Sequence, residues 1–272
     1  MPELPEVEAT RRGIERAAVG RRIRELRLYE ARLRWPVDPT IVDEVAGQQL
    51  CAAGRRAKYL LLVLERGTLI LHLGMSGSLR ILPADAPLRK HDQFELLLAN
   101  DTTLRFNDPR RFGSLHYTRE DPARHRLLQH LAPEPFTPDF DAAYLRRITR
   151  GRRVAIKQVL MNSRLVTGVG NIYASEALFR ARIHPRRRAG RLTEKDCARL
   201  VRAVRGALSA AIRAGGTTLR DYVGTDGNPG AFRQRLYVYE RDGQRCRRCG
   251  TLIRTITQGQ RSSYFCPHCQ PK

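Results

Sequence analysis

AKYLLLVLE, at Ala57–Glu65, is a short apolar run that is followed by the turn residues Arg66 and Gly67. Further short apolar runs follow it along the chain, and turn residues such as Gly and Asn separate them. They lie at Leu69–Leu73, Ser78–Leu82, Gln93–Leu98, Leu104–Asn107 and Gly113–Tyr117. Short apolar runs bounded by turn residues indicate strands. Many short strands joined by tight turns predict an antiparallel β-sandwich over roughly residues 22–131.

The sequence on either side of these runs predicts helices. The apolar spacing of Val7, Ile14 and Ala18 indicates a first helix that starts at about Leu4 or Pro5. After the strands, apolar residues at three- and four-residue spacing predict helices at Ala142–Thr149, Ala155–Asn162, Ile172–Ala181 and Thr193–Ala214. Thr193 has the sequence context of an N-cap, and Gly215-Gly216 ends the last helix.

The order of these elements predicts an α+β multidomain protein. We expect an N-terminal β-sandwich domain at residues 1–131 and a helical domain at 141–232. Between them, residues 132–140 (APEPFTPDF) carry three prolines in nine residues and are expected to be a linker. Residues 233–272 form a small unit that contains cysteines.

The composition favours a folded protein that binds a polyanion. The 272 residues include 50 Lys and Arg against 27 Asp and Glu, which gives a net charge of +23. A basic surface on a chain with 42% hydrophobic residues favours nucleic acid as the partner, with solubility as the alternative. The chain has no apolar run of about 18 residues and no basic-then-apolar secretory pattern, so we expect a soluble cytosolic protein without a membrane partner.

The C-terminal unit has the sequence of a zinc site. Cys246 and Cys249 form one C-x2-C pair, and Cys266 and Cys269 form a second pair after sixteen intervening residues. Two such pairs on a hairpin supply four thiolates at tetrahedral positions, whereas one pair alone could be a redox site. Four protein ligands leave no open position for water, so we expect one structural Zn²⁺.

The chain begins Met1-Pro2-Glu3, which places a proline and a carboxylate at the terminus. If Met1 is removed, Pro2 becomes a free secondary amine, and its attack on an electrophilic carbon gives an iminium without an N–H proton. An α-amino group titrates near ~7.7–8.0, far below lysine at about 10.4, so much of it is free base at neutral pH. Such an amine suits the opening of a sugar. The alternative is an ordinary helix start that tolerates proline.

Seven separated blocks of sequence, in order, match one protein family. They are MPELPEVE at Met1–Glu8, RRAKYLLL at Arg55–Leu62, HLGMSGSLR at His72–Arg80, KHD at Lys90–Asp92, DPRRFG at Asp108–Gly113, GVGNIYASEALF at Gly168–Phe179 and GGTTLRDY at Gly215–Tyr222. With the four cysteines, the chain resembles bacterial formamidopyrimidine-DNA glycosylase from end to end. The resemblance implies a leading helix with an N-terminal antiparallel β-sandwich, a helix–two-turns–helix domain and a C-terminal zinc-finger β-hairpin.

The resemblance also implies an activity: a bifunctional DNA glycosylase and AP lyase of base excision repair that flips oxidised purines out of double-stranded DNA. Pro2 would attack C1′ and form a Schiff base, and Glu3 would protonate the ring oxygen of the sugar. Lys58 would be the proton donor for β-elimination, and Arg261 would act at the phosphate of the damaged site and in δ-elimination. From charge alone, Lys58 could also be a strand charge and Arg261 a solvated arginine.

The same resemblance implies residues that hold the DNA. Met75, Arg110 and Phe112 match the wedge that fills the gap left by the flipped base, with core packing as the alternative for the two apolar side chains. Asn171 follows Gly168-Val169-Gly170, where backbone N–H groups and an amide can hold a phosphate. Further DNA contacts are expected of His91, Arg152 and Lys157. The loop Thr217–Gly230 would cover the extruded base, and the enzyme would be a monomer in the bacterial cytoplasm, bound to the nucleoid through DNA.

Two other functions remain open from the sequence. Endonuclease VIII, a relative with the same chemistry, acts on oxidised pyrimidines, but its relatives usually have glycine where this chain has Leu4. A non-catalytic zinc-finger DNA-binding protein could keep the fold and lose the chemistry, but Pro2, Glu3 and Lys58 are all present here.

Overall fold

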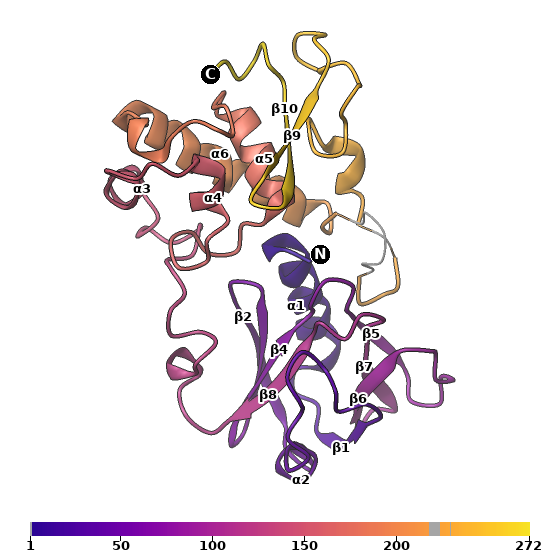
Figure 1. Ribbon diagram of the computed structural model, residues 1–272. Coiled ribbons are helices and arrows are strands. Elements are labelled where there is room, and N and C mark those ends of the chain that lie inside the picture. Colours follow the sequence, from indigo (N-terminus) through magenta and orange to yellow (C-terminus); the bar gives the residue numbers. More distant parts are fainter. Residues whose placement is uncertain (1, 218–223, 229) are drawn as a thin grey trace. The chain divides into compact units, whose positions relative to one another are not determined.

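The computed structural model describes residues 2–217, 224–228 and 230–272, which fall into two compact units (Figure 1). The first unit holds the chain up to Gln129 together with Ile212–Arg233. The second unit holds His130–Ala211 and Gln234–Lys272. Compact units need not coincide with domains, so the expected boundaries at residues 131, 140 and 232 stay a prediction.

The first unit contains a leading helix and two antiparallel sheets. Its elements are α1 (Leu4–Ala18), β1 (Ile23–Leu28), α2 (Ile41–Val45), β2 (Leu50–Arg56), β3 (Tyr59–Leu64), β4 (Gly67–His72), β5 (Ser78–Pro83), β6 (Asp92–Leu98), β7 (Thr102–Asn107), β8 (Ser114–Thr118) and the 3₁₀ turn η1 (Pro122–Arg124). One sheet has the order β1-β6-β7-β5 and the other β2-β3-β4-β8. All strand pairs in both sheets are antiparallel, which confirms the predicted β-sandwich.

The core of the sandwich comes from alternate residues of the strands. Leu60, Leu62 and Leu64 of β3 are buried, while the residues between them are partly exposed. From the other sheet, the rings of Phe94 and Phe106 stack with their centroids 5.0 Å apart in the same cluster of buried residues. Each of the apolar runs predicted as strands overlaps one of β3 to β8.

The sequence analysis missed two strands. β1 (IRELRL) and β2 (LCAAGRR) contain charged or small residues, and each buries only two residues, Ile23 and Leu26 in β1 and Leu50 and Ala53 in β2. Their apolar signal is therefore weak, and hydrogen bonds to the neighbouring strands β6 and β3 determine their conformation.

The predicted position of Lys58 inside a strand was wrong. Ala57 and Lys58 form the two-residue turn between β2 and β3. Arg56 and Tyr59, on either side of this turn, are the last pair of the β2–β3 ladder. Ala57 has a φ of 56°, which a strand does not allow.

The remaining elements include the predicted helices and the C-terminal hairpin. They are α3 (Ala142–Thr149), α4 (Ile156–Leu160), α5 (Asn171–Arg180), η2 (Ala189–Arg191), α6 (Glu194–Arg213), η3 (Phe232–Arg235), β9 (Arg254–Gln258) and β10 (Arg261–Phe265). At the start of α6, Asp196 N donates to Thr193 Oγ1 at 3.1 Å and Thr193 N donates to Asp196 Oδ2 at 3.0 Å, which confirms the predicted N-cap. None of the helices in the described ranges is both long and apolar enough to cross a membrane.

Glu176 of α5 anchors the chain that leads into the C-terminal hairpin. Its side chain is fully buried and accepts hydrogen bonds from the backbone N–H groups of Tyr237, Val238 and Tyr239 at 2.9–3.1 Å. Burial raises the pKa of the Glu176 carboxyl, and these backbone donors oppose that rise. The ring of Phe179, one turn further along α5, stacks on Tyr237 with centroids 5.2 Å apart.

We expect Glu176→Ala to lower the free energy of unfolding by about 3 kcal/mol, because one buried and two partly buried N–H groups lose their acceptor. Urea unfolding followed by circular dichroism measures this change. Glu120→Ala, at an exposed position, is the control and should change stability by less than about 0.5 kcal/mol. Equal stability of the two variants would contradict the anchoring role of Glu176.

Candidate functional site

Pro2 and Glu3 lie buried at the start of α1, where Glu3 is the N-cap residue. Glu3 N donates to Glu6 Oε2 at 2.7 Å, and Thr217 N donates to Glu6 Oε1 at 2.7 Å. Gly216, with a φ of +88°, allows this approach, since a Cβ there would lie 3.1 Å from Glu6 Cγ. Glu6 therefore ties the N-terminus to the start of the predicted lesion-covering loop.

The sequence analysis did not select Glu6 as a site residue. The three-residue spacing of Glu3 and Glu6 could have indicated the capping hydrogen bond between them. No local signal indicates the second partner, Thr217, which is 211 residues away in sequence. Met1, and residues 218–223 and 229 of the predicted loop Thr217–Gly230, lie outside the described residues. The removal of Met1 and the covering role of the loop stay predictions.

Lys58 lies beside a histidine that sequence reasoning also missed. His72 pairs with Tyr59 in the β3–β4 ladder, and their rings are 4.8 Å apart. Burial, and then the charges of Lys58 and Arg34, lower the pKa of His72 to about 4, so the ring is neutral at pH 7. Gly74 N donates to His72 Nδ1 at 3.0 Å, which assigns the proton to Nε2. The available signal was the position of His72 at the start of the HLGMSGSLR block.

The three residues of the predicted wedge lie together on two adjacent loops. Met75 is 38% exposed and Phe112 is 42% exposed, which excludes core packing for both side chains. The guanidinium carbon of Arg110 lies 4.8 Å from the centre of the Phe112 ring. The loops touch closely, because a Cβ on Gly74 would lie 2.4 Å from Gly113 N.

His91 belongs to the same region of the first unit. Its side chain is exposed, its φ is 72°, and its carbonyl accepts a hydrogen bond from Asp108 N at 3.0 Å. This bond places His91 next to the loop that carries Arg110 and Phe112.

In the second unit, Arg152, Lys157 and Arg261 line one hollow of about 450 Å³. Arg152 and Arg261 are exposed, and Arg261 follows the hairpin turn at Gly259-Gln260. Lys157 is only 2% exposed: its Nζ donates to Ser262 O at 2.8 Å and to Ser263 Oγ at 2.7 Å. Lys157 therefore ties α4 to β10, whereas the direct DNA contact implied by the resemblance stays a prediction.

Asn171 is the first residue of α5, after the N-cap Gly170. Its Oδ1 atom is buried and has no hydrogen-bond partner within the described part of the chain. Gly168, with a φ of 78°, lets the backbone turn into the helix N-terminus. A helix N-terminus with backbone N–H groups and an amide is a favourable place for an anion.

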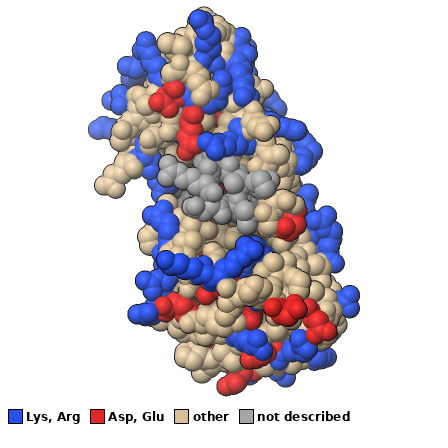
Figure 2. Space-filling view, turned by 90° about the vertical axis from the view of Figure 1, so that its right-hand side faces the viewer, with Lys and Arg blue, Asp and Glu red and all other residues tan. Residues whose placement is uncertain are grey.

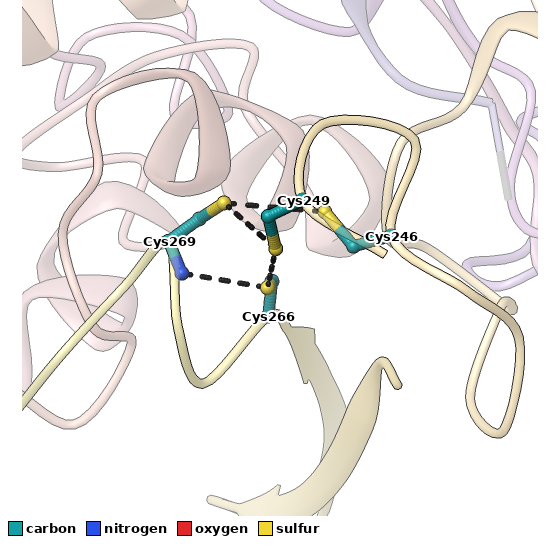
Figure 3. A group of neighbouring side chains, drawn as sticks. All are labelled: Cys246, Cys249, Cys266 and Cys269. Atoms are coloured by element: carbon teal, nitrogen blue, oxygen red, sulfur yellow. Dashed lines mark hydrogen bonds between the residues drawn. The ribbon is translucent and has the colours of Figure 1, made fainter. Parts of the chain in front are cut away.

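The four predicted zinc ligands form one cluster (Figure 3). Their sulfur atoms all lie within 4.8 Å of one another. The Cys246–Cys269 pair is 4.0 Å apart, and Cys249 is 3.5 Å from both Cys266 and Cys269. A tetrahedron with Zn–S bonds of about 2.3 Å has S–S edges of about 3.8 Å, so the cluster fits one zinc ion.

The turns of the finger also direct backbone donors at sulfur. Arg248 N donates to Cys246 Sγ at 3.4 Å, and Cys269 N donates to Cys266 Sγ at 3.4 Å. His268, which could in principle have replaced a cysteine, is exposed and is not part of the cluster. Four thiolates would hold the zinc as a structural ion, which fixes the finger that carries Arg261.

The surface agrees with the excess of positive charge in the sequence. On the face drawn in Figure 2, Lys and Arg side chains occur at many places among tan residues, whereas Asp and Glu form smaller, separate groups. A surface of this kind attracts the phosphates of nucleic acid.

Sequence models of three domain families match most of the chain. The Formamidopyrimidine-DNA glycosylase N-terminal domain matches residues 1–115, and the Formamidopyrimidine-DNA glycosylase H2TH domain matches residues 131–223. The zinc finger found in FPG and IleRS matches residues 243–272. These matches confirm the architecture and the zinc finger that the resemblance implied.

Known proteins are similar to the chain over its whole length. The Formamidopyrimidine-DNA glycosylase of Thioalkalivibrio sulfidiphilus is 56% identical over 270 residues, which cover 99% of this chain and 100% of the relative. A mutant FPG of Lactococcus lactis, crystallised with a Fapy-dG containing DNA, is 35% identical over 100% of both chains, with a TM-score of 0.93. The FPG protein of Thermus thermophilus is 38% identical over 100% of this chain and 99% of its own, with a TM-score of 0.89.

Removal of zinc should unfold the finger. We expect Cys249→Ser to lower the zinc content below one ion per protein and to lower the melting temperature, because structural zinc contributes about 10–16 kcal/mol to small zinc peptides. Metal analysis and differential scanning calorimetry measure both effects. Cys51→Ser, at an exposed cysteine outside the cluster, is the matched control. Full zinc content in Cys249→Ser would contradict the ligand set.

His72 should make the protein sensitive to acid. Its pKa of about 4 lies below the ordinary 6.5, so the unfolded chain binds a proton before the folded protein does. The resulting stability is complete above pH 6.5 and is lost as the pH falls towards 4. In urea unfolding, the free energy of unfolding of His72→Gln should therefore fall less steeply between pH 6.5 and 4 than that of the unchanged protein. Parallel curves would show that His72 is protonated normally in the fold.

Proposed function

Because the chain belongs to the formamidopyrimidine-DNA glycosylase family, which removes oxidised purines in base excision repair, we propose that Pro2 is the nucleophile of this enzyme. The family membership rests on relatives that are similar over the whole chain. The observation that supports the role of Pro2 is its place next to Glu3 at the start of α1. We also propose double-stranded DNA with oxidised purines, such as 8-oxoguanine and formamidopyrimidines, as the substrate.

The proposed reaction begins on the sugar of a nucleotide flipped out of the duplex. The Pro2 nitrogen forms a bond to C1′, the bond between C1′ and the damaged base breaks, and the proton lost by the Pro2 amine neutralises the departing base. Glu3 gives a proton to the ring oxygen as the sugar opens, which leaves an iminium between Pro2 and C1′. The hydrogen bond from Glu3 N to Glu6 Oε2 holds this part of the chain in place for both steps.

Strand cleavage follows from the same iminium. Lys58 is the proposed proton donor for β-elimination, and its place in the tight β2–β3 turn supports a defined position for the ammonium group. Arg261 is proposed to bind the phosphate of the damaged site and to assist δ-elimination. Its support is an exposed position at the start of β10, which the zinc finger and Lys157 hold. The product is a one-nucleoside gap with a phosphate at each end.

The remaining site residues are proposed to bind the DNA. Met75 and Phe112 would fill the gap left by the flipped base, and Arg110 would face the orphaned cytosine. Contacts to phosphates are proposed for His91, Arg152, Lys157 and Asn171. The enzyme would act as a monomer in the bacterial cytoplasm, on the DNA of the nucleoid.

Blocking the N-terminus tests the proposal for Pro2. Borohydride should trap a covalent adduct between the enzyme and a duplex with 8-oxoguanine opposite cytosine when the affinity tag is at the C-terminus. The same tag fixed in front of Pro2 should abolish trapping and lower base excision by at least about 100-fold, because the secondary amine is gone. Gel analysis and mass spectrometry of the adduct measure this.

The controls separate the alternatives. Both tagged proteins should bind the duplex, which shows that the tag blocks chemistry and not folding. A crosslink on a side chain other than Pro2 would overturn the assigned nucleophile. Stronger trapping on a duplex with thymine glycol would favour a preference for oxidised pyrimidines, and absence of any adduct would favour a DNA-binding protein without catalysis.

A further inference from the structure

Asp108 is a buried carboxylate at the start of the loop that carries Arg110 and Phe112. It is 0% exposed, and no cation lies within salt-bridge distance of it in the described ranges. Its Oδ2 accepts a hydrogen bond from Gly113 N at 2.8 Å, and its Oδ1 accepts one from Arg110 N at 3.3 Å. The carboxylate thus closes its own loop from Asp108 to Gly113.

The same carboxylate also holds the other loop of the wedge. Ser76 Oγ donates to Asp108 Oδ1 at 2.7 Å, and both residues are buried. Ser76 directly follows Met75 in a turn that the bond from Gly77 N to Leu73 O closes at 2.9 Å. One side chain therefore connects the turn of Met75 to the loop of Phe112.

The ring of Phe106 supports both loops from below. A Cβ on Gly77 would lie 2.8 Å from this ring, and a Cβ on Gly113 would lie 2.6 Å from it. The backbone of Asp108 is fixed as well, because its carbonyl accepts from Gln93 Nε2 at 2.8 Å. The loops can therefore not move towards the core, and the Ser76–Asp108 hydrogen bond limits their separation from each other.

We propose that Asp108 and Ser76 are positioning residues that join Met75 and Phe112 into one rigid wedge. The proposal rests on the proposed role of these two side chains in the gap left by the flipped base. Opening a base step costs stacking free energy. The wedge therefore keeps the gap open only if the side chains of Met75 and Phe112 cannot be displaced independently of each other. A charge-assisted hydrogen bond in a buried place is strong enough to resist such a displacement.

The decisive variant is Ser76→Ala, which removes the link and leaves every bond within the Asp108–Gly113 loop. We expect it to lower single-turnover excision of 8-oxoguanine from a duplex by about tenfold, as for loss of a hydrogen bond to a charged group. Cleavage of a single-stranded oligonucleotide with an abasic site should not change, because it has no base stack to enter. Ser114→Ala is the matched control, since Ser114 is buried beside the loop and its Oγ has no partner in the part of the chain that the structure describes.

A double-mutant cycle shows whether the link acts through the wedge. In a Met75→Ala background, Ser76→Ala should cost nothing further, because the tip that it positions is absent. Asp108→Asn should also slow excision from the duplex, by more than Ser76→Ala does, and leave cleavage of single-stranded abasic DNA unchanged. If its melting temperature falls too far for assay, Ser76→Ala and the cycle still decide the question.

Three results would overturn the proposal. In the first, Ser76→Ala and Ser114→Ala excise 8-oxoguanine from the duplex at the same single-turnover rate. In the second, Ser76→Ala loses as much activity on single-stranded abasic DNA as on the duplex. In the third, Met75→Ala and Phe112→Ala keep full activity on the duplex. These side chains would then not act as a wedge, and Asp108 and Ser76 would have no wedge to position. Failure of the proposed nucleophile is a different outcome, because the unchanged enzyme would then form no adduct on either substrate.

Discussion

Buried carboxylates that accept hydrogen bonds from backbone N–H groups hold the functional segments of this protein. Glu6 accepts from Glu3 N and Thr217 N, and Glu176 accepts from the start of the C-terminal hairpin segment. Asp108 accepts from Gly113 N and from the hydroxyl of Ser76. Each acid is at most 1% exposed, so water does not compete for these hydrogen bonds.

This use of acids explains how a very basic chain can keep precise loops. With a net charge of +23, arginines and lysines remain exposed for phosphates, as Figure 2 shows for one face. Acids on the same surface would weaken that attraction. Acids in the interior instead bind backbone donors of the loops that glycines and tight turns leave without a regular ladder.

The hairpin at the C-terminus depends on a second kind of support. The zinc ligands fix one end of the finger, and Lys157 holds Ser262 and Ser263 of β10 from α4. Arg261, the first residue of β10, directly precedes the two serines that Lys157 holds. An exposed arginine on a short hairpin has a defined position only if the hairpin cannot slide, and both supports prevent this movement.

The sequence by itself determined the elements with a local signal: the apolar strands, the helices and the four zinc ligands, whose spacing is a local property. Resemblance supplied the candidate catalytic residues. Only the tertiary structure placed Lys58 in a turn next to His72, showed β1 and β2, and gave Glu6, Ser76 and Asp108 their partners. The physical reason is separation: Glu6 and Thr217 lie 211 residues apart and Lys157 and Ser263 lie 106 apart, so no local pattern can encode these hydrogen bonds.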